Sequence, residues 1–145
     1  PEDWINKLRD VVGVPDKNLV LVGHSLGCPT VVGYLMTMKE DSFVAGAVFV
    51  AGFVSRIPNY EPLKEWDFDL VEVQYAKDHC GDYRKNFVSI VSDNDSDVPP
   101  EKSKELNDLL CGELIVEHNK GHFCEEDGVK ELPSALSAIL KIFGL

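Results

Sequence analysis

The sequence predicts an α/β fold of three layers, in which a mostly parallel sheet lies between helices. Short, continuous apolar runs alternate along the chain with segments in which apolar residues recur every three or four positions. Apolar runs without polar alternation are typical of strands that helices cover on both faces. Because strands that alternate with helices form crossover units, the strands are expected to run parallel.

The first half of the chain is expected to supply two helices and two strands. Five apolar residues near the N-terminus are spaced like one face of an amphipathic helix: Trp4, Ile5, Leu8, Val11 and Val12. Gly13 and Pro15 end this helix. Residues 19–22 are too few for a helix and predict a strand buried on both faces. A helix is expected from Leu26 to about Lys39, followed by a strand over residues 45–51.

The second half continues the alternation after an interruption. Strands are predicted at 87–91 and 114–116, and helices at 99–110 and, despite Pro133, at 129–143. The stretch of residues 53–86 is too long for a simple connection, so we interpret it as an inserted cap with a helix from about Asp69 to Asp78. The chain is therefore expected to form a single domain over residues 1–145 with a cap insertion at about 53–86.

The net charge limits the partners to be expected, and the cysteine content indicates the cellular compartment. The 145 residues contain 14 Lys and Arg against 25 Asp and Glu, which gives a net charge of −11 and a pI of about 4.7. Such a surface repels nucleic acid and anionic lipid, so neither is an expected partner. The cysteines at 28, 80, 111 and 124 lack close paired spacing and are expected to be free thiols of a cytoplasmic protein. No cofactor is expected.

The pattern Gly-His-Ser-Leu-Gly at 23–27 lies between the first predicted strand and the following helix. A serine at such a tight turn, called a nucleophile elbow, exposes its hydroxyl above the sheet, and the flanking glycines allow neighbouring backbone to approach. The N–H of Leu26, at a helix N-terminus, is expected to face the oxyanion of a tetrahedral intermediate. The pattern therefore predicts that Ser25 is a nucleophile.

A nucleophilic serine needs a base and an acid that orients the base. His122 is the best candidate base, because it follows Gly121 in the loop after the last predicted strand, at the same edge of the sheet as Ser25. His24 is interpreted as a packing residue, and His79 and His118 as packed or solvated side chains. The acid is expected in the run at 92–99, which contains three aspartates among which composition cannot choose: Asp93, Asp95 and Asp97.

Three segments together resemble a known family. They are Leu-Val-Gly-His-Ser-Leu-Gly-Cys-Pro (21–29), Ser-Asp-Asn-Asp-x-x-Val-Pro (92–99) and Gly-His-Phe (121–123). This combination resembles the small α/β-hydrolases of the retinoblastoma-binding serine hydrolase group. The resemblance implies an α/β-hydrolase fold and a triad of Ser25, Asp95 and His122. The family begins with a strand and a His-Gly-rich loop that supplies a second oxyanion N–H; since the sequence lacks both, we expect these residues to be the C-terminal portion of the full fold.

The expected function is that of a serine hydrolase of carboxylesterase type. Acidic residues near the candidate acid and base favour small uncharged acyl esters over anionic ones. Trp66 and Phe68 are expected to line an acyl-binding site. The alternatives are an acyltransferase that uses the same residues, or a non-catalytic interaction module, which the pattern Leu109-x-Cys111-x-Glu113 would favour. No metal site is expected, and the sequence does not identify a protein partner.

Overall fold

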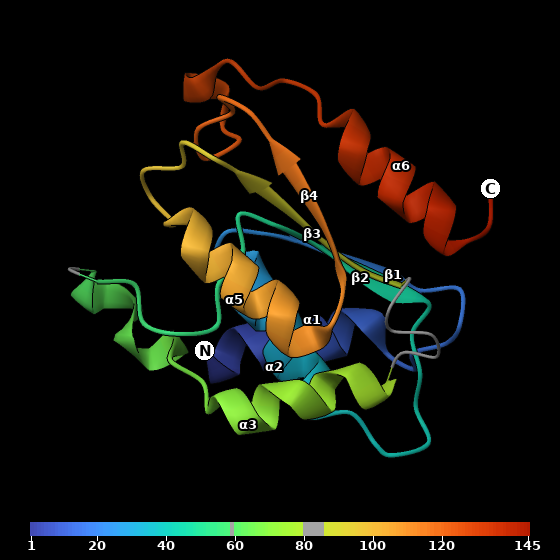
Figure 1. The fold of residues 1–145 in the computed structure, drawn as a ribbon. Helices are drawn as coiled ribbons and strands as arrows, with labels where there is room; N and C mark the ends of the chain where they lie inside the picture. The colour runs from blue at the N-terminus through green and yellow to red at the C-terminus, as the bar shows by residue number, and fades with distance from the viewer. Residues whose placement is uncertain (59, 80–85) are drawn as a thin grey trace.

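The computed structural model describes residues 1–58, 60–79 and 86–145. Its centre is a sheet of four parallel strands in the order β1-β2-β3-β4, so neighbours in the sheet are also neighbours along the chain (Figure 1). The strands are β1 (Val20–His24), β2 (Gly46–Val50), β3 (Phe87–Ser92) and β4 (Glu113–Glu117). The predicted α/β class and its four strands are therefore confirmed.

Helices cover both faces of this sheet (Figure 1). The helices of the first layer are α1 (Glu2–Val12), α2 (Gly27–Met36), α3 (Leu70–Val73) and α5 (Pro100–Leu110). Helix α6 (Pro133–Ile142) lies on the opposite face. Short 3-10 helices complete the described chain: η1 (Glu61–Trp66), η2 (Gln74–His79) and η3 (Glu125–Asp127). Because the strands follow one another across the sheet in one direction, crossovers of one hand place their helices on one face.

Two apolar cores fill the spaces between the layers. On the side of α2 and α5, Phe49 and Phe87 meet edge to face with ring centroids 6.0 Å apart. On the side of α6, Val48 and Val50 of β2 and Val88 and Ile90 of β3 pack in one cluster with Ala138. Both central strands are buried along their whole length, as their continuous apolar runs predict.

The prediction that the first strand is buried on both faces is wrong. In β1, Leu21 is buried while Val22 on the other face is 51% exposed. Helix α6 packs over β2 and β3, and Val20 at the start of β1 packs against the same core cluster, whereas Val22 is left exposed. The burial of an apolar run thus depends on where its strand lies in the sheet.

The last helix begins four residues later than predicted. Pro133 occupies the first turn of α6, and Leu132 before it is extended, with φ −130° and ψ 78°. Proline disfavours the helical conformation in the residue that precedes it, so a helix that contains Pro133 in its first turn cannot start at 129.

The predicted helix at 69–78 is present but changes type along its length. Asp69 caps α3 by accepting hydrogen bonds from the N–H groups of Val71 and Glu72, and the chain continues directly as η2. These turns pack against α2 and α5. Residues 59 and 80–85, which include Cys80, lie outside the described part of the predicted insertion.

None of the helices in the described residues is both long enough and apolar enough to cross a membrane.

Candidate active site

The three residues of the expected triad lie at one edge of the sheet. Ser25 follows β1, Asp95 follows β3 and His122 follows β4, each beyond the carboxyl end of its strand. In parallel sheets these ends face the same way, and binding sites form outside them. The topology therefore brings together side chains that are 97 positions apart in the sequence.

The turn at Ser25, the predicted nucleophile elbow, has a left-handed backbone conformation. Ser25 has a φ of 51°, and its N–H donates to the carbonyl of Val50 over 2.9 Å. A left-handed conformation is unfavourable for a residue with a side chain, so its presence here marks a position that the surroundings impose. The strand-to-helix turn is thus fixed from the neighbouring strand β2.

The two glycines of the turn, Gly23 and Gly27, have different surroundings. A Cβ atom on Gly23 would lie 2.7 Å from the carbonyl carbon of Gly27 and 2.8 Å from the backbone nitrogen of Cys28. A Cβ on Gly27 would meet nothing within 4 Å among the described residues. The expectation that both glycines allow close backbone approach is therefore right for Gly23 and wrong for Gly27.

The N–H of Leu26 stands at the N-terminus of α2. Within the described residues no hydrogen-bond acceptor is recorded for it. Unpaired N–H groups at a helix N-terminus carry partial positive charge and attract anions. This N–H can therefore donate to an oxyanion formed beside Ser25.

His122 and Asp95 form a hydrogen-bonded pair. The Nδ1 atom of His122 lies 2.9 Å from Oδ2 and 3.1 Å from Oδ1 of Asp95. The side chain of His122 is 11% exposed and that of Asp95 is 1% exposed. The hydrogen bond to Asp95 raises the pKa of His122 above its usual value of 6.5, while partial burial opposes this change. A carboxylate on Nδ1 requires the proton there and leaves Nε2 as the basic nitrogen.

The three candidate acids make different contacts. Besides His122, Asp95 accepts hydrogen bonds from the backbone N–H groups of Asp97 and Val98. Asp93 instead lies 2.6 Å from Nδ1 of His118, and this hydrogen bond lowers the pKa of the Asp93 carboxyl. Among the described contacts, the carboxylate of Asp97 has only the hydroxyl of Ser96 as a hydrogen-bond partner.

Consecutive residues of the acidic loop also hold the loop that carries His122. The Oγ of Ser92 accepts from the N–H of Lys120, Oδ1 of Asp93 from Asn119, and Oδ1 of Asn94 from Gly121. Together with the pair of Asp95 and His122, these contacts join residues 92–95 to residues 118–122. The polar run after β3 therefore holds the loop that carries His122 and also contains the candidate acid.

His24 has a role that the sequence interpretation missed. Its side chain is exposed rather than buried in a core, and Nε2 lies 2.8 Å from the carbonyl oxygen of His122. The two imidazole rings are 4.8 Å apart at their centroids. A histidine next to the nucleophile in a Gly-His-Ser turn was a usable signal, but its partner across the sheet edge could not be identified from spacing.

Ser25 and His122 lie at the same edge of the sheet, and among the described residues no hydrogen bond joins their side chains. The described contacts of the Ser25 hydroxyl include none to His122, although His24, adjacent to Ser25, touches the His122 ring. Distances between nucleophile and base are often long without substrate and shorten when substrate binds.

The aromatic residues expected to bind substrate lie in a third apolar cluster. Trp66 is 6% exposed and packs edge to face with Phe68, with centroids 6.4 Å apart. The same cluster includes Leu26, so it supports the backbone next to Ser25.

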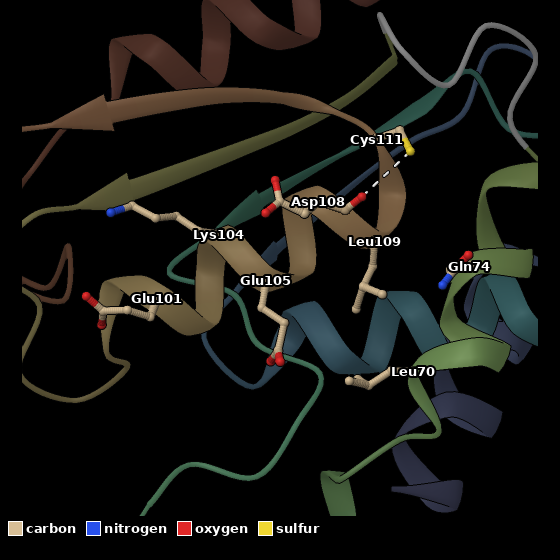
Figure 2. A pocket seen from close by; sticks show the side chains of 8 residues that line it. All are labelled: Leu70, Gln74, Glu101, Lys104, Glu105, Asp108, Leu109 and Cys111. Atoms are coloured by element: carbon tan, nitrogen blue, oxygen red, sulfur yellow. Dashed lines mark hydrogen bonds between the residues drawn. The ribbon is translucent and has the colours of Figure 1, made fainter.

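A groove of about 630 Å³ lies elsewhere, between α3 and α5 (Figure 2). Its walls include Leu70 and Leu109, and no residue of the expected triad lines it. Leu109, Cys111 and Glu113, which form the candidate interaction pattern, come from a helix, a left-handed turn and a strand. Glu113 is paired with Lys141 over 2.5 Å. The groove and the candidate active site are therefore separate features.

Comparisons with known proteins agree with this architecture. The YdeN protein of Bacillus subtilis, which is assigned as a hydrolase, is 29% identical over 142 residues, covering 98% of this chain and 73% of YdeN. The crystal structure of YdeN has a TM-score of 0.83 at 27% identity, over 99% of this chain and 75% of that chain.

A more distant structure shows the same fold. A structure from a study of carboxylesterases of the thaumarchaeon Nitrososphaera gargenis has a TM-score of 0.68 at 14% identity, over 97% of this chain and 71% of that one. The fold is thus that of the α/β-hydrolases. The sequence model of the serine hydrolase family matches residues 1–141, and the chain belongs to this family.

Proposed function

We propose that the protein is a carboxylesterase that cleaves small uncharged acyl esters with Ser25, His122 and Asp95. The observation that carries this proposal is the hydrogen bond between His122 and the buried carboxylate of Asp95, at the sheet edge where the Ser25 turn also lies. A base oriented in this way beside a serine elbow is the arrangement that acyl transfer requires.

The reaction follows from these positions. Ser25 Oγ attacks the ester carbonyl carbon while Nε2 of His122 takes the hydroxyl proton. The Leu26 N–H donates to the oxyanion, and collapse of the intermediate breaks the ester bond as His122 returns the proton to the leaving alcohol. Water, deprotonated by His122, then attacks the acyl carbonyl carbon; the bond to Ser25 Oγ breaks as His122 returns the proton to Oγ, which releases the carboxylic acid and restores the serine. Asp95 keeps the proton on Nδ1 and stabilises the imidazolium throughout.

The preference for uncharged esters rests on the charges around His122. Asp97 and Asp127 both stabilise the protonated form of His122, so their negative charge reaches the reacting atoms. The same charge repels an anionic substrate as it approaches. Trp66 and Phe68 are proposed to shape the acyl side of the site through the cluster that contains Leu26.

The resemblance to the retinoblastoma-binding group within the family is part of this proposal. It rests on the three sequence segments that contain Ser25, Asp95 and His122.

A fluorophosphonate probe tests the proposal, because it reacts covalently with an activated serine. We expect one adduct per molecule by intact mass, lost in Ser25→Ala and strongly reduced in His122→Ala. Ser96→Ala, which changes an exposed serine in the acidic loop, is the matched control and should label normally. Absence of an adduct in folded protein, as judged by circular dichroism, would contradict the nucleophile assignment and favour a non-catalytic interaction module.

A further inference from the structure

We infer that Asp127 is a positioning residue that fixes the backbone of the general base His122. The inference rests on the proposed function, since it assigns a role within the same site. Asp127 lies in η3, five residues after His122, and in the sequence it is one of three acidic residues in a row. Its contacts in the structure differ from those of its two acidic neighbours, Glu125 and Glu126.

The carboxylate of Asp127 binds two N–H groups of the loop that carries His122, which we call the base loop (residues 118–124). Its Oδ2 atom accepts hydrogen bonds from the N–H of His122 over 2.8 Å and from the N–H of Cys124 over 3.2 Å. Hydrogen bonds to an ionised acceptor are shorter and stronger than those between neutral groups. One side chain therefore holds the N–H of His122 and the N–H of the residue two positions after it.

The opposite side of the same residue is held by His24. The carbonyl of His122 accepts a hydrogen bond from Nε2 of His24 over 2.8 Å. His122 thus has its N–H bound by Asp127, its C=O bound by His24, and its imidazole bound by Asp95. Three partners from three different segments leave the base little freedom to move away from Ser25.

The local backbone is shaped to admit this carboxylate. Gly121 has a φ of 53°, and a Cβ atom on it would lie 2.1 Å from Oδ1 of Asp127. The position therefore requires glycine for both its conformation and the space that Asp127 fills. Phe123 on the other side also has a positive φ, of 58°, and is buried against the α6 core. His122 accordingly sits between two left-handed residues whose unfavourable conformation the surrounding contacts must offset.

The two acidic neighbours of Asp127 do not share its contacts. Among the described residues, no hydrogen bond joins the side chain of Glu125 or Glu126 to the base loop. An acidic run with a purely electrostatic role would not need one member aimed at two N–H groups. Glu126→Ala is therefore a suitable control, because it removes one negative charge but leaves the hydrogen bonds of Asp127 to His122 and Cys124 in place.

The test compares three variants on the alkaline plateau of ester hydrolysis, where His122 is neutral. Asp127→Ala leaves two N–H groups without their acceptor, and we expect kcat to fall about 10- to 100-fold with KM little changed, as for a misplaced catalytic group. Asp127→Asn keeps an acceptor oxygen and should recover kcat to within about threefold of the parent. Glu126→Ala should behave like the parent. A loss of stability alone would not reduce kcat per folded molecule. It would also not explain a recovery of kcat in Asp127→Asn.

A second readout does not depend on turnover. The Nδ1 proton of His122, hydrogen-bonded to Asp95, should give a downfield resonance that is lost in Asp127→Ala and kept in Asp127→Asn and Glu126→Ala. If the parent hydrolyses no ester, the proposed function fails, but the resonance still tests whether Asp127 positions His122. Parent-like kcat together with a parent-like resonance in Asp127→Ala would overturn the inference. An asparagine variant as impaired as the alanine variant would also overturn it.

Discussion

The contact with Asp95 determines which ring nitrogen of His122 carries the proton. Since Asp95 is nearly fully buried and faces Nδ1, the proton stays there and Nε2 carries the lone pair. The sequence predicted the base from its place after the last strand, but it left three aspartates open as the acid. Only the resemblance to a family singled out Asp95.

Asp95 could not be chosen from the sequence because the choice depends on the register between strands β3 and β4. Ser92 pairs with Glu117 at the ends of β3 and β4, and this register sets which residue beyond the strands faces which. Asp93 then reaches His118, and Asp95, two positions later, reaches His122. Composition does not encode this correspondence, because all three aspartates are acceptable in a polar turn.

Substitution of Asp95 tests the pair at the level of the single residue. The raised pKa of His122 means that activity, which needs neutral imidazole, is lost as the pH falls through that value. Asp95→Asn removes the charge that stabilises the imidazolium, so the pKa of His122 should fall and the acid limb should move to lower pH. The rate should drop by about 10⁴-fold because the wrong tautomer becomes accessible. Titration of the His122 resonance by NMR gives the pKa directly.

Asp93→Asn is the matched control for this experiment. Its carboxylate contacts His118 and the N–H of Asn119 and does not touch the His122 ring. Asparagine keeps an oxygen that can accept from Asn119, so the loop should stay in place and the rate and the His122 titration should stay close to those of the parent. A large loss of activity in Asp97→Asn, with Asp95→Asn unaffected, would show that the acid is misassigned.

At the level of elements, the strand-to-helix turn at 23–27 was the most readily predicted feature, because it combines a strand, a short motif and a helix start. Most other elements also follow from periodicity, including α1, α2 and the two central strands. The exceptions have local causes. Pro133 sets where α6 begins, and the position of β1 in the sheet exposes Val22.

The two glycines of the elbow allow a matched stability experiment. Gly23→Ala places a methyl group 2.7 to 2.8 Å from backbone atoms of Gly27 and Cys28, which cannot yield as a flexible side chain could. We expect the free energy of unfolding to fall by about 3 kcal/mol or more, as for other overpacked buried positions. Gly27→Ala adds a methyl group where no described atom lies within 4 Å. Its free energy of unfolding should change by less than about 1 kcal/mol.

Urea denaturation followed by circular dichroism measures both variants under one set of conditions. Equal stability of the two variants would mean that the turn relaxes to accept a side chain at Gly23. The fluorophosphonate label then tells whether a relaxed turn still presents an activated Ser25.

At the scale of the whole molecule, part of the net charge of −11 lies at the candidate active site. Aspartates at 93, 95, 97 and 127 gather at the sheet edge, and two of them, Asp95 and Asp127, are hydrogen-bonded to the ring and the backbone N–H of His122. The sequence predicted an acidic rim but not this division of roles. Net charge says nothing about which carboxylates are engaged, so that part of the site required the structure.

The acidic edge predicts how the rate depends on substrate charge and salt. We expect a neutral ester to be hydrolysed faster than an ester of the same acyl chain that carries a carboxylate on its alcohol, when kcat/KM is compared at low ionic strength. Salt screens charges over about 10 Å at 0.1 M and about 3 Å at 1 M, so the difference should shrink steadily as salt is added. Both esters are expected to react with Ser25 by the same steps. They differ in how the aspartates at the sheet edge affect the approach of the substrate to the site. Equal values of kcat/KM at low salt would contradict the electrostatic argument, and a difference that salt leaves unchanged would place selectivity in shape, at the cluster of Trp66 and Phe68.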